Sequence, residues 1–106
     1  DKTEPIFRMK DVNLALENGD FDAAAMAIQD IIADKIAGGK SEKEAKQAIR
    51  SGLTAYWKPL YLQAYADNDS AEMARIRKTI AKAGIYVDKR GRSTVVETCQ
   101  SWVKEQ

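Results

Sequence analysis

Residues 41–56 read SEKEAKQAIRSGLTAY and give the clearest indication of the fold. Ser41 and Glu44 form a capping box, because the serine hydroxyl can accept from the backbone N–H of Glu44 while that carboxylate reaches back to the serine N–H. Apolar residues then recur at a helical period, at Ala45, Ala48, Ile49, Leu53 and Tyr56. This stretch predicts an amphipathic helix with one buried side.

Residues 1–40 carry the start and stop signals of two further helices. Pro5 suits the first turn of a helix that would run to about Asn18, and Gly19 can end it. Asp20 is the N-cap expected for a second helix, whose apolar residues also follow a helical period. The pair of glycines at 38 and 39 stops this second helix.

Residues 57–106 also contain helix start and stop signals. Pro59 lacks a backbone N–H and disfavours helical geometry in the residue before it, so we expect a kink or break there. Asp69 with Glu72 makes a second capping box, and Thr94 with Glu97 starts the final helix. Between them, residues 86–93 form a basic loop.

These signals predict an all-α fold: a compact bundle of five or six short helices joined by short loops. A chain of 106 residues has the size of one domain. We therefore expect a single helical domain over 1–106, with an N-terminal helical hairpin at 1–40 and a helical module with a kink at Pro59 at 41–106.

The composition argues against an enzyme. The chain has no histidine, which removes the commonest general base and the usual zinc ligand sets. Its one cysteine, Cys99, lies on the apolar face of the final helix, and we expect a buried, unreactive thiol. We predict no catalytic residues, no cofactor, no metal and no small-molecule substrate. No apolar run approaches the roughly 20 residues that span a membrane, so no membrane association is expected.

The charges are sorted along the chain although the formal net charge is only +1. Residues 1–34 contain three basic and eight acidic residues, a net charge of −5, whereas residues 75–106 contain eight basic and three acidic residues, a net charge of +5. Such a distribution can bind charged partners or stack copies head to tail. Alternatively, the two ends lie near each other in the fold and partly neutralise.

Two sequence motifs resemble functional sites but lack required parts. Gly39-Lys40-Ser41 resembles the end of a phosphate-binding loop, yet the earlier glycine and the preceding strand are missing, so a helix stop and a helix start are favoured. Asp67, Asp69 and Glu72 do not match the ligand positions of a calcium-binding loop.

Trp57, Tyr61 and Tyr65 are spaced four residues apart and share one helical face. Such an aromatic stripe is more often core, although aromatic faces also stack nucleic-acid bases.

A basic cluster is the strongest candidate binding surface. Arg75, Lys78 and Lys82 share a helical face, and Lys89, Arg90 and Arg92 follow in the glycine-containing loop. Lysine and arginine supply the phosphate contacts of nucleic-acid-binding proteins. The two interpretations left open are a solvated basic face and a surface for nucleic acid or an acidic protein.

Residues 41–102 resemble a helical module found in bacteriophage and prophage proteins. The matching features are Lys58-Pro59-Leu60-Tyr61, a short acidic turn, a basic helix ending in Gly84-Ile85-Tyr86, and a closing helix with Val95-Val96, Cys99 and Trp102. The resemblance implies a piece of a larger phage-encoded protein, including one carried in or on the virion. It implies no catalytic activity.

We therefore expect a non-enzymatic structural or protein-interaction module of a phage-encoded protein. Its partners would be proteins of an assembly, and it would act in the host cytoplasm or within a phage particle. The alternative is a nucleic-acid-binding module that uses the basic helix and loop.

Overall fold

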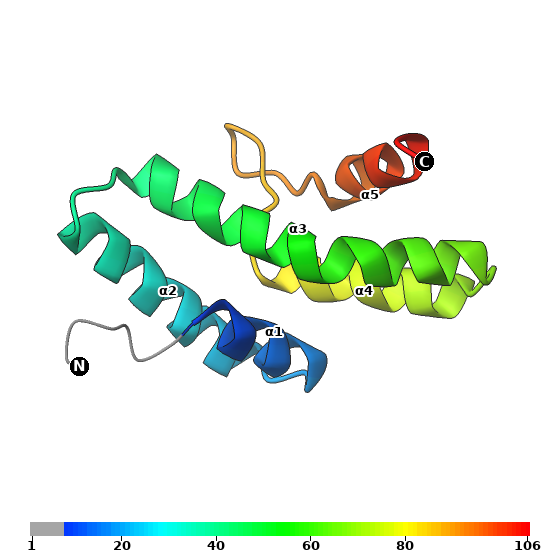
Figure 1. Cartoon of the computed structure of the whole chain (residues 1–106), viewed down its shortest axis with the longest axis horizontal. Coiled ribbons are helices and arrows are strands. Elements are labelled where there is room, and N and C mark those ends of the chain that lie inside the picture. Colours follow the sequence, from blue (N-terminus) through cyan, green and yellow to red (C-terminus); the bar gives the residue numbers. More distant parts are fainter. Residues whose placement is uncertain (1–7) are drawn as a thin grey trace. The chain divides into compact units, whose positions relative to one another are not determined.

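The computed structural model describes residues 8–106 of the chain (Figure 1). The chain divides into two compact units, Asp1–Gly52 and Leu53–Gln106. The boundary falls within a helix, and the expectation of a single domain stays a prediction. The expected helix start at Pro5 lies outside the described residues.

The described residues contain five helices and no strand, which confirms the all-α prediction. The helices are α1 (Met9–Glu17), α2 (Phe21–Ala37), α3 (Glu42–Ala66), α4 (Ser70–Lys82) and α5 (Val95–Lys104). Not all of them are short, because α3 has 25 residues.

Helices α1 and α2 form an antiparallel hairpin in the first unit (Figure 1). Gly19 ends α1 with a φ of 75°, a conformation that a glycine adopts without a steric penalty. Asp20 then caps α2 as predicted, since its Oδ1 accepts from the backbone N–H of Ala23 at 3.2 Å. The buried residues of the hairpin are mainly aliphatic, with Asn13 as the polar exception: Val12, Leu16, Ala24, Ala27, Ile28, Ile31 and Ile32.

Helix α3 begins at the predicted capping box. The Ser41 N–H donates to Glu44 Oε1 at 2.9 Å, and the Glu44 N–H donates to Ser41 Oγ at 3.1 Å. These hydrogen bonds lower the pKa of the Glu44 carboxyl. Both halves of the predicted box are therefore confirmed.

Helix α3 continues through Pro59 to Ala66, so of the two outcomes expected there the break is wrong, while the kink stays a prediction. Leu53, Trp57, Tyr61 and Ala64 lie on one face of the helix, on both sides of Pro59, and all four are buried. A proline inside a helix costs about 3 kcal/mol. Burial of these apolar side chains outweighs that cost, since each large one contributes roughly 2 kcal/mol or more.

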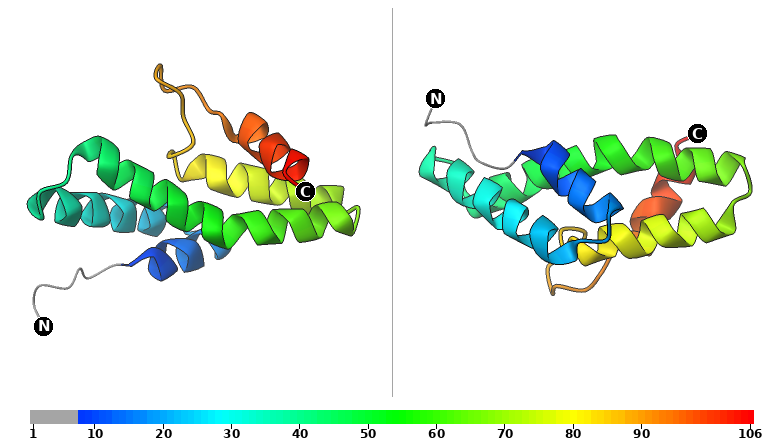
Figure 2. Two further views of the ribbon diagram at one scale, coloured as in Figure 1. Left: turned by 45° about the horizontal axis from the view of Figure 1, so that its top comes forward. Right: turned by 90° about the horizontal axis from the view of Figure 1, so that it is seen from below.

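The second unit consists of the C-terminal part of α3 together with α4 and α5. Figure 2 shows α4 running back beside this part of α3 and α5 packing against the two. Asp69 caps α4 as predicted, accepting from the Glu72 N–H at 3.1 Å, but the Glu72 carboxylate binds Arg75 rather than the Asp69 N–H. The second half of that capping box is therefore wrong.

Helix α5 starts where predicted, after Thr94, but the N-cap hydrogen bond expected from the Thr94 side chain is absent. Thr94 Oγ1 is buried without a partner among the described residues. The first N–H of the helix, that of Val95, instead donates to Ser93 Oγ at 3.4 Å.

A close approach in the first unit explains a glycine in the middle of α3. A Cβ built on Gly52 would lie 2.8 Å from Met9 Cγ, which is closer than side-chain carbons normally pack. We predict that Gly52→Ala gives about 1 kcal/mol of stabilisation in a Met9→Ala background, because alanine is the better helix former. In the wild-type background we expect a smaller gain or a net loss, measured by urea unfolding. Equal effects in the two backgrounds would contradict this explanation.

Candidate functional site

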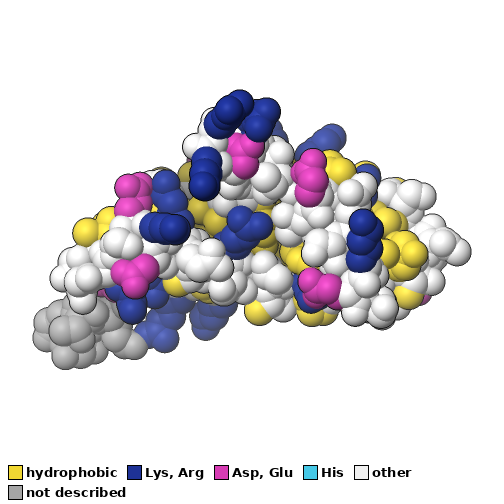
Figure 3. Space-filling view, turned by 90° about the horizontal axis from the view of Figure 1, so that it is seen from above, with side chains coloured by type: hydrophobic (Ala, Val, Ile, Leu, Met, Phe, Trp, Pro, Cys, Tyr) yellow, Lys and Arg dark blue, Asp and Glu magenta, His cyan; other side chains and the backbone are white. Residues whose placement is uncertain are grey.

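An open, largely apolar groove lies in the second unit. Its volume is about 450 Å³, within the range of ligand pockets. Three helices line it, with Tyr61 and Tyr65 from α3, Met73 from α4, and Gln100, Val103 and Lys104 from α5. Figure 3 shows hydrophobic side chains at the surface of the second unit, over α5 and the C-terminal part of α3.

Tyr61, one of the residues that line this groove, is held in place by a buried aromatic contact and a hydrogen bond. The Tyr61 ring meets the Trp102 ring edge to face, with centroids 5.9 Å apart and an interplanar angle of 70°. The Tyr61 hydroxyl also accepts from Arg77 Nη1 at 3.1 Å. Because ring and hydroxyl are both engaged, Tyr61 presents a fixed surface to the groove. Tyr65 also lines the groove, with 46% of its surface exposed.

The lining carries one charged residue, Lys104, which is exposed. The acidic residue next to it, Glu105, is bound elsewhere, since Lys58 Nζ donates to Glu105 Oε1 at 2.6 Å. That hydrogen bond is the main cause of the lowered pKa of the Glu105 carboxyl. The ion pair ties α5 to α3 and leaves the groove with a positively charged edge.

The aromatic stripe on α3 is mainly core. Trp57 and Tyr61 are buried, which confirms the core interpretation for these two residues. Tyr65 is the exception, because it is half-exposed at the groove. With two of its three rings buried, the stripe offers no row of exposed faces on which bases could stack.

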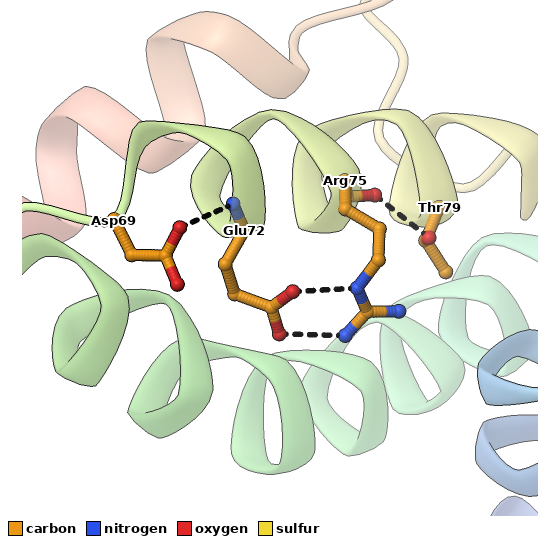
Figure 4. Close-up of polar contacts among 4 residues, drawn as sticks. All are labelled: Asp69, Glu72, Arg75 and Thr79. Carbon is orange, nitrogen blue, oxygen red and sulfur yellow. Dashed lines mark hydrogen bonds and ion pairs between the residues drawn. The ribbon is translucent and has the colours of Figure 1, made fainter.

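Arg75, the first residue of the basic cluster, is exposed but is engaged by Glu72 and the Trp57 ring. Its Nε and Nη2 donate to the two Glu72 carboxylate oxygens, both at 2.7 Å (Figure 4). Its Cζ lies 6.0 Å from the centre of the Trp57 ring. The Arg75 guanidinium lowers the pKa of Glu72, so the carboxylate stays ionised and neutralises the arginine.

The basic loop is organised around the Asp88 side chain. Asp88 Oδ1 accepts from the backbone N–H groups of Arg90 at 2.8 Å and Arg92 at 2.9 Å, and Oδ2 accepts from Arg92 Nε at 3.0 Å. A β-bridge between Val87 and Ser93 closes the loop. Backbone N–H groups that could otherwise face a phosphate therefore already bind a carboxylate of this chain.

The six candidate residues therefore differ in whether a nearby carboxylate binds them. Lys78 and Lys82 are exposed one turn apart on α4, and Lys89 and Arg90 are exposed at the tip of the loop. Arg75 and Arg92 are paired with Glu72 and Asp88. On the face of the molecule that Figure 3 draws, acidic side chains are interspersed with lysine and arginine side chains. The cluster is a mixed surface rather than a uniformly basic one.

The motifs that resembled other sites have structural roles. Gly39 ends α2 with a φ of 102° and Ser41 caps α3, which confirms the helix stop and start at the Gly-Lys-Ser motif. Asp67 accepts from Gln63, and Asp69 caps α4. Within residues 8–106, no group of three or more His, Cys, Asp or Glu residues could hold a metal ion.

Cys99 is fully buried on α5, as expected. Burial disfavours the thiolate and raises the pKa of the thiol to about 11, against a smaller opposing effect of Arg77. The thiol is therefore protonated and inert at neutral pH. In the part of the chain that the structure describes, no helix is both long and apolar enough to cross a membrane.

The sequence did not reveal the groove, although the spacing of some of its lining residues could be read from it. Tyr61 and Tyr65 are four residues apart, and Gln100, Val103 and Lys104 follow helical spacing on α5. Each set predicts a helical face, but nothing in the spacing shows that the two faces border the same space.

In comparisons with known proteins, no family model, curated protein or solved structure matches this chain significantly.

The ionised Asp88 carboxylate should hold the basic loop together. Hydrogen bonds from Arg92 and Arg90 lower the pKa of Asp88 below its ordinary value of 3.8. A group with a lowered folded-state pKa stabilises the fold above its unfolded pKa, and this contribution is lost as the pH falls through the folded value. We predict that the amide chemical shifts of Arg90 and Arg92 titrate together with a midpoint below 3.8.

Asp88→Asn should abolish this titration, which provides the control. A midpoint at or above the ordinary aspartate value would contradict this account of the loop.

Proposed function

We propose that this chain is a non-enzymatic protein-docking module of a phage-encoded protein, one that acts in an assembly in the host cytoplasm or within a phage particle. The observation that carries the proposal is the open apolar groove of the second unit. Protein interfaces are centred on buried apolar and aromatic anchors surrounded by a polar rim. The groove offers this combination, with Tyr65, Met73 and Val103 inside and Gln100 and Lys104 at its α5 side.

The chemistry of the chain supports docking rather than catalysis. It contains no histidine to act as a general base near neutral pH. The Cys99 thiol is buried and protonated, and the Glu72 carboxylate is bound by an arginine. Among residues 8–106, neither Cys99 nor Glu72 is therefore an activated nucleophile paired with a base.

The phage assignment is supported by the resemblance over residues 41–102. The residues that carry it form the frame of the second unit: Tyr61, Tyr86, Cys99 and Trp102 are all buried. A pattern of this kind specifies a scaffold rather than an active site. A scaffold with an exposed groove is consistent with a module that assembles with other proteins.

A peptide titration tests the docking function. We expect a synthetic acidic amphipathic helix with one large apolar anchor to shift the amide resonances of Tyr65, Met73 and Val103. A peptide with lysine in place of each acidic residue should bind more weakly, because Lys104 repels it. Lys104→Glu should weaken binding of the acidic peptide by about tenfold, which corresponds to about 1.4 kcal/mol.

Lys78→Glu is the matched control, since it makes the same charge change at an exposed position outside the groove. If neither peptide moves the groove resonances, or if both variants weaken binding equally, the groove is not a docking site.

The alternative function, nucleic-acid binding, is favoured by one observation: Lys89 and Arg90 are exposed at the tip of an ordered loop. If this function is correct, the chain binds a short DNA duplex with an affinity that falls steeply as salt rises, because phosphate contacts release counterions. Lys89→Glu combined with Arg90→Glu should abolish binding in fluorescence anisotropy. Lys40→Glu with Lys43→Glu, an equal charge change outside the cluster, should have little effect. Salt-independent binding, or equal loss in both double variants, would exclude this function.

A further inference from the structure

Helix α2 has an exposed apolar stripe opposite its buried side. Met26 is 64% exposed, and Ala33 and Ala37 are exposed as well. Residues 26, 33 and 37 fall on one side of a helix, whereas the buried Ile28, Ile31 and Ile32 fall on the other. Met26 is therefore the large apolar side chain that this side of α2 offers to a partner.

Acidic residues flank this stripe. Asp22 and Asp30 lie four residues before and after Met26, and Asp34 follows one turn later. All three aspartates are exposed. The α2 surface is therefore a large flexible apolar side chain bordered by negative charge.

The groove of the second unit has the complementary chemistry. Its lining is mainly apolar or aromatic, with one neutral polar residue, Gln100, and one charged residue, Lys104. Methionine adapts to irregular apolar spaces and makes favourable contacts with aromatic rings. A methionine bordered by aspartates fits both the apolar interior of the groove and its positive edge.

We propose that the groove of one copy of this chain binds helix α2 of a second copy. Met26 of one copy enters the groove between Tyr65, Met73 and Val103 of the other, and Asp22 or Asp30 pairs with Lys104. This inference rests on the proposed docking function and specifies its partner. The opposite net charges of residues 1–34 and 75–106 favour the same pairing over its reverse.

The two surfaces belong to different parts of the chain, so the contact is heterologous. Each copy offers one α2 surface and one groove, which allows copies to add head to tail into a ring or an open chain. Such growth is a property suited to a component of an assembly.

Sedimentation velocity across protein and salt concentration tests this inference. We expect the wild-type chain to form larger species as its concentration rises and to revert toward monomer at high salt, because the charge pairing is screened. Met26→Glu removes the inserted side chain, and Lys104→Glu reverses the charge of the groove. Both positions are exposed, so both variants should fold, and each alone should stay monomeric.

A mixture of the two variants provides the decisive measurement. Met26→Glu retains an intact groove and Lys104→Glu retains an intact α2, so equal amounts should form a 1:1 dimer that grows no further. Lys78→Glu, the matched control, should assemble like the wild type. A monomeric wild type, or a mixture that remains monomeric, would overturn the inference. If the acidic peptide still bound the groove in that case, docking to a different protein would stand; if it did not, both proposals would fall.

Discussion

The indole of Trp102 joins the elements of the second unit through two aromatic contacts. Its ring centre lies 5.9 Å from that of Tyr61 on α3 and 6.3 Å from that of Tyr86, the first residue of the basic loop. The hydroxyl of Tyr86 and Thr54 Oγ1 lie 2.9 Å apart, which fixes this tyrosine against α3. Aromatic pairs of this geometry contribute about 1 kcal/mol each beyond the area they bury. The position of α5, and hence one side of the groove, depends on them.

The acidic residues of the second unit act mainly on local structure. Asp69 caps α4, Glu72 holds Arg75, Asp88 shapes the basic loop and Glu105 fixes α5 through Lys58. Each of these carboxylates satisfies backbone or cationic donors close to it in space. As a result, Lys58, Arg75 and Arg92 are neutralised locally by these carboxylates, whereas Lys104 lines the groove.

Two surfaces therefore stand out, and each lies on one unit. The first unit presents the exposed side of α2 around Met26. The second unit presents the groove that Tyr65 helps to line. Both combine apolar contact area with charge of one sign, which is the chemistry that gives protein interfaces their affinity and their choice of partner. Because the charges of the two surfaces are opposite, the proposed docking function and the proposed self-assembly can use the same groove.

Local sequence alone determined most of the helical architecture. The capping box at Ser41, the cap at Asp20 and the glycine stops at 19 and 39 all appear as predicted, because these signals act through hydrogen bonds and backbone angles within one turn. The candidate basic residues were identified by type, and Lys78, Lys82, Lys89 and Arg90 are exposed as a binding surface requires.

Tertiary structure decided what short-range signals cannot encode. Helix α3 continues through Pro59 because side chains on both sides of the proline are buried, and Arg75 is neutralised because it lies between Glu72 and the Trp57 ring. The groove exists only where Tyr61, Met73 and Val103, distant in sequence, border one space. Spacing along a helix specifies a face, but which faces meet depends on how whole helices pack, and that is a property of the folded chain.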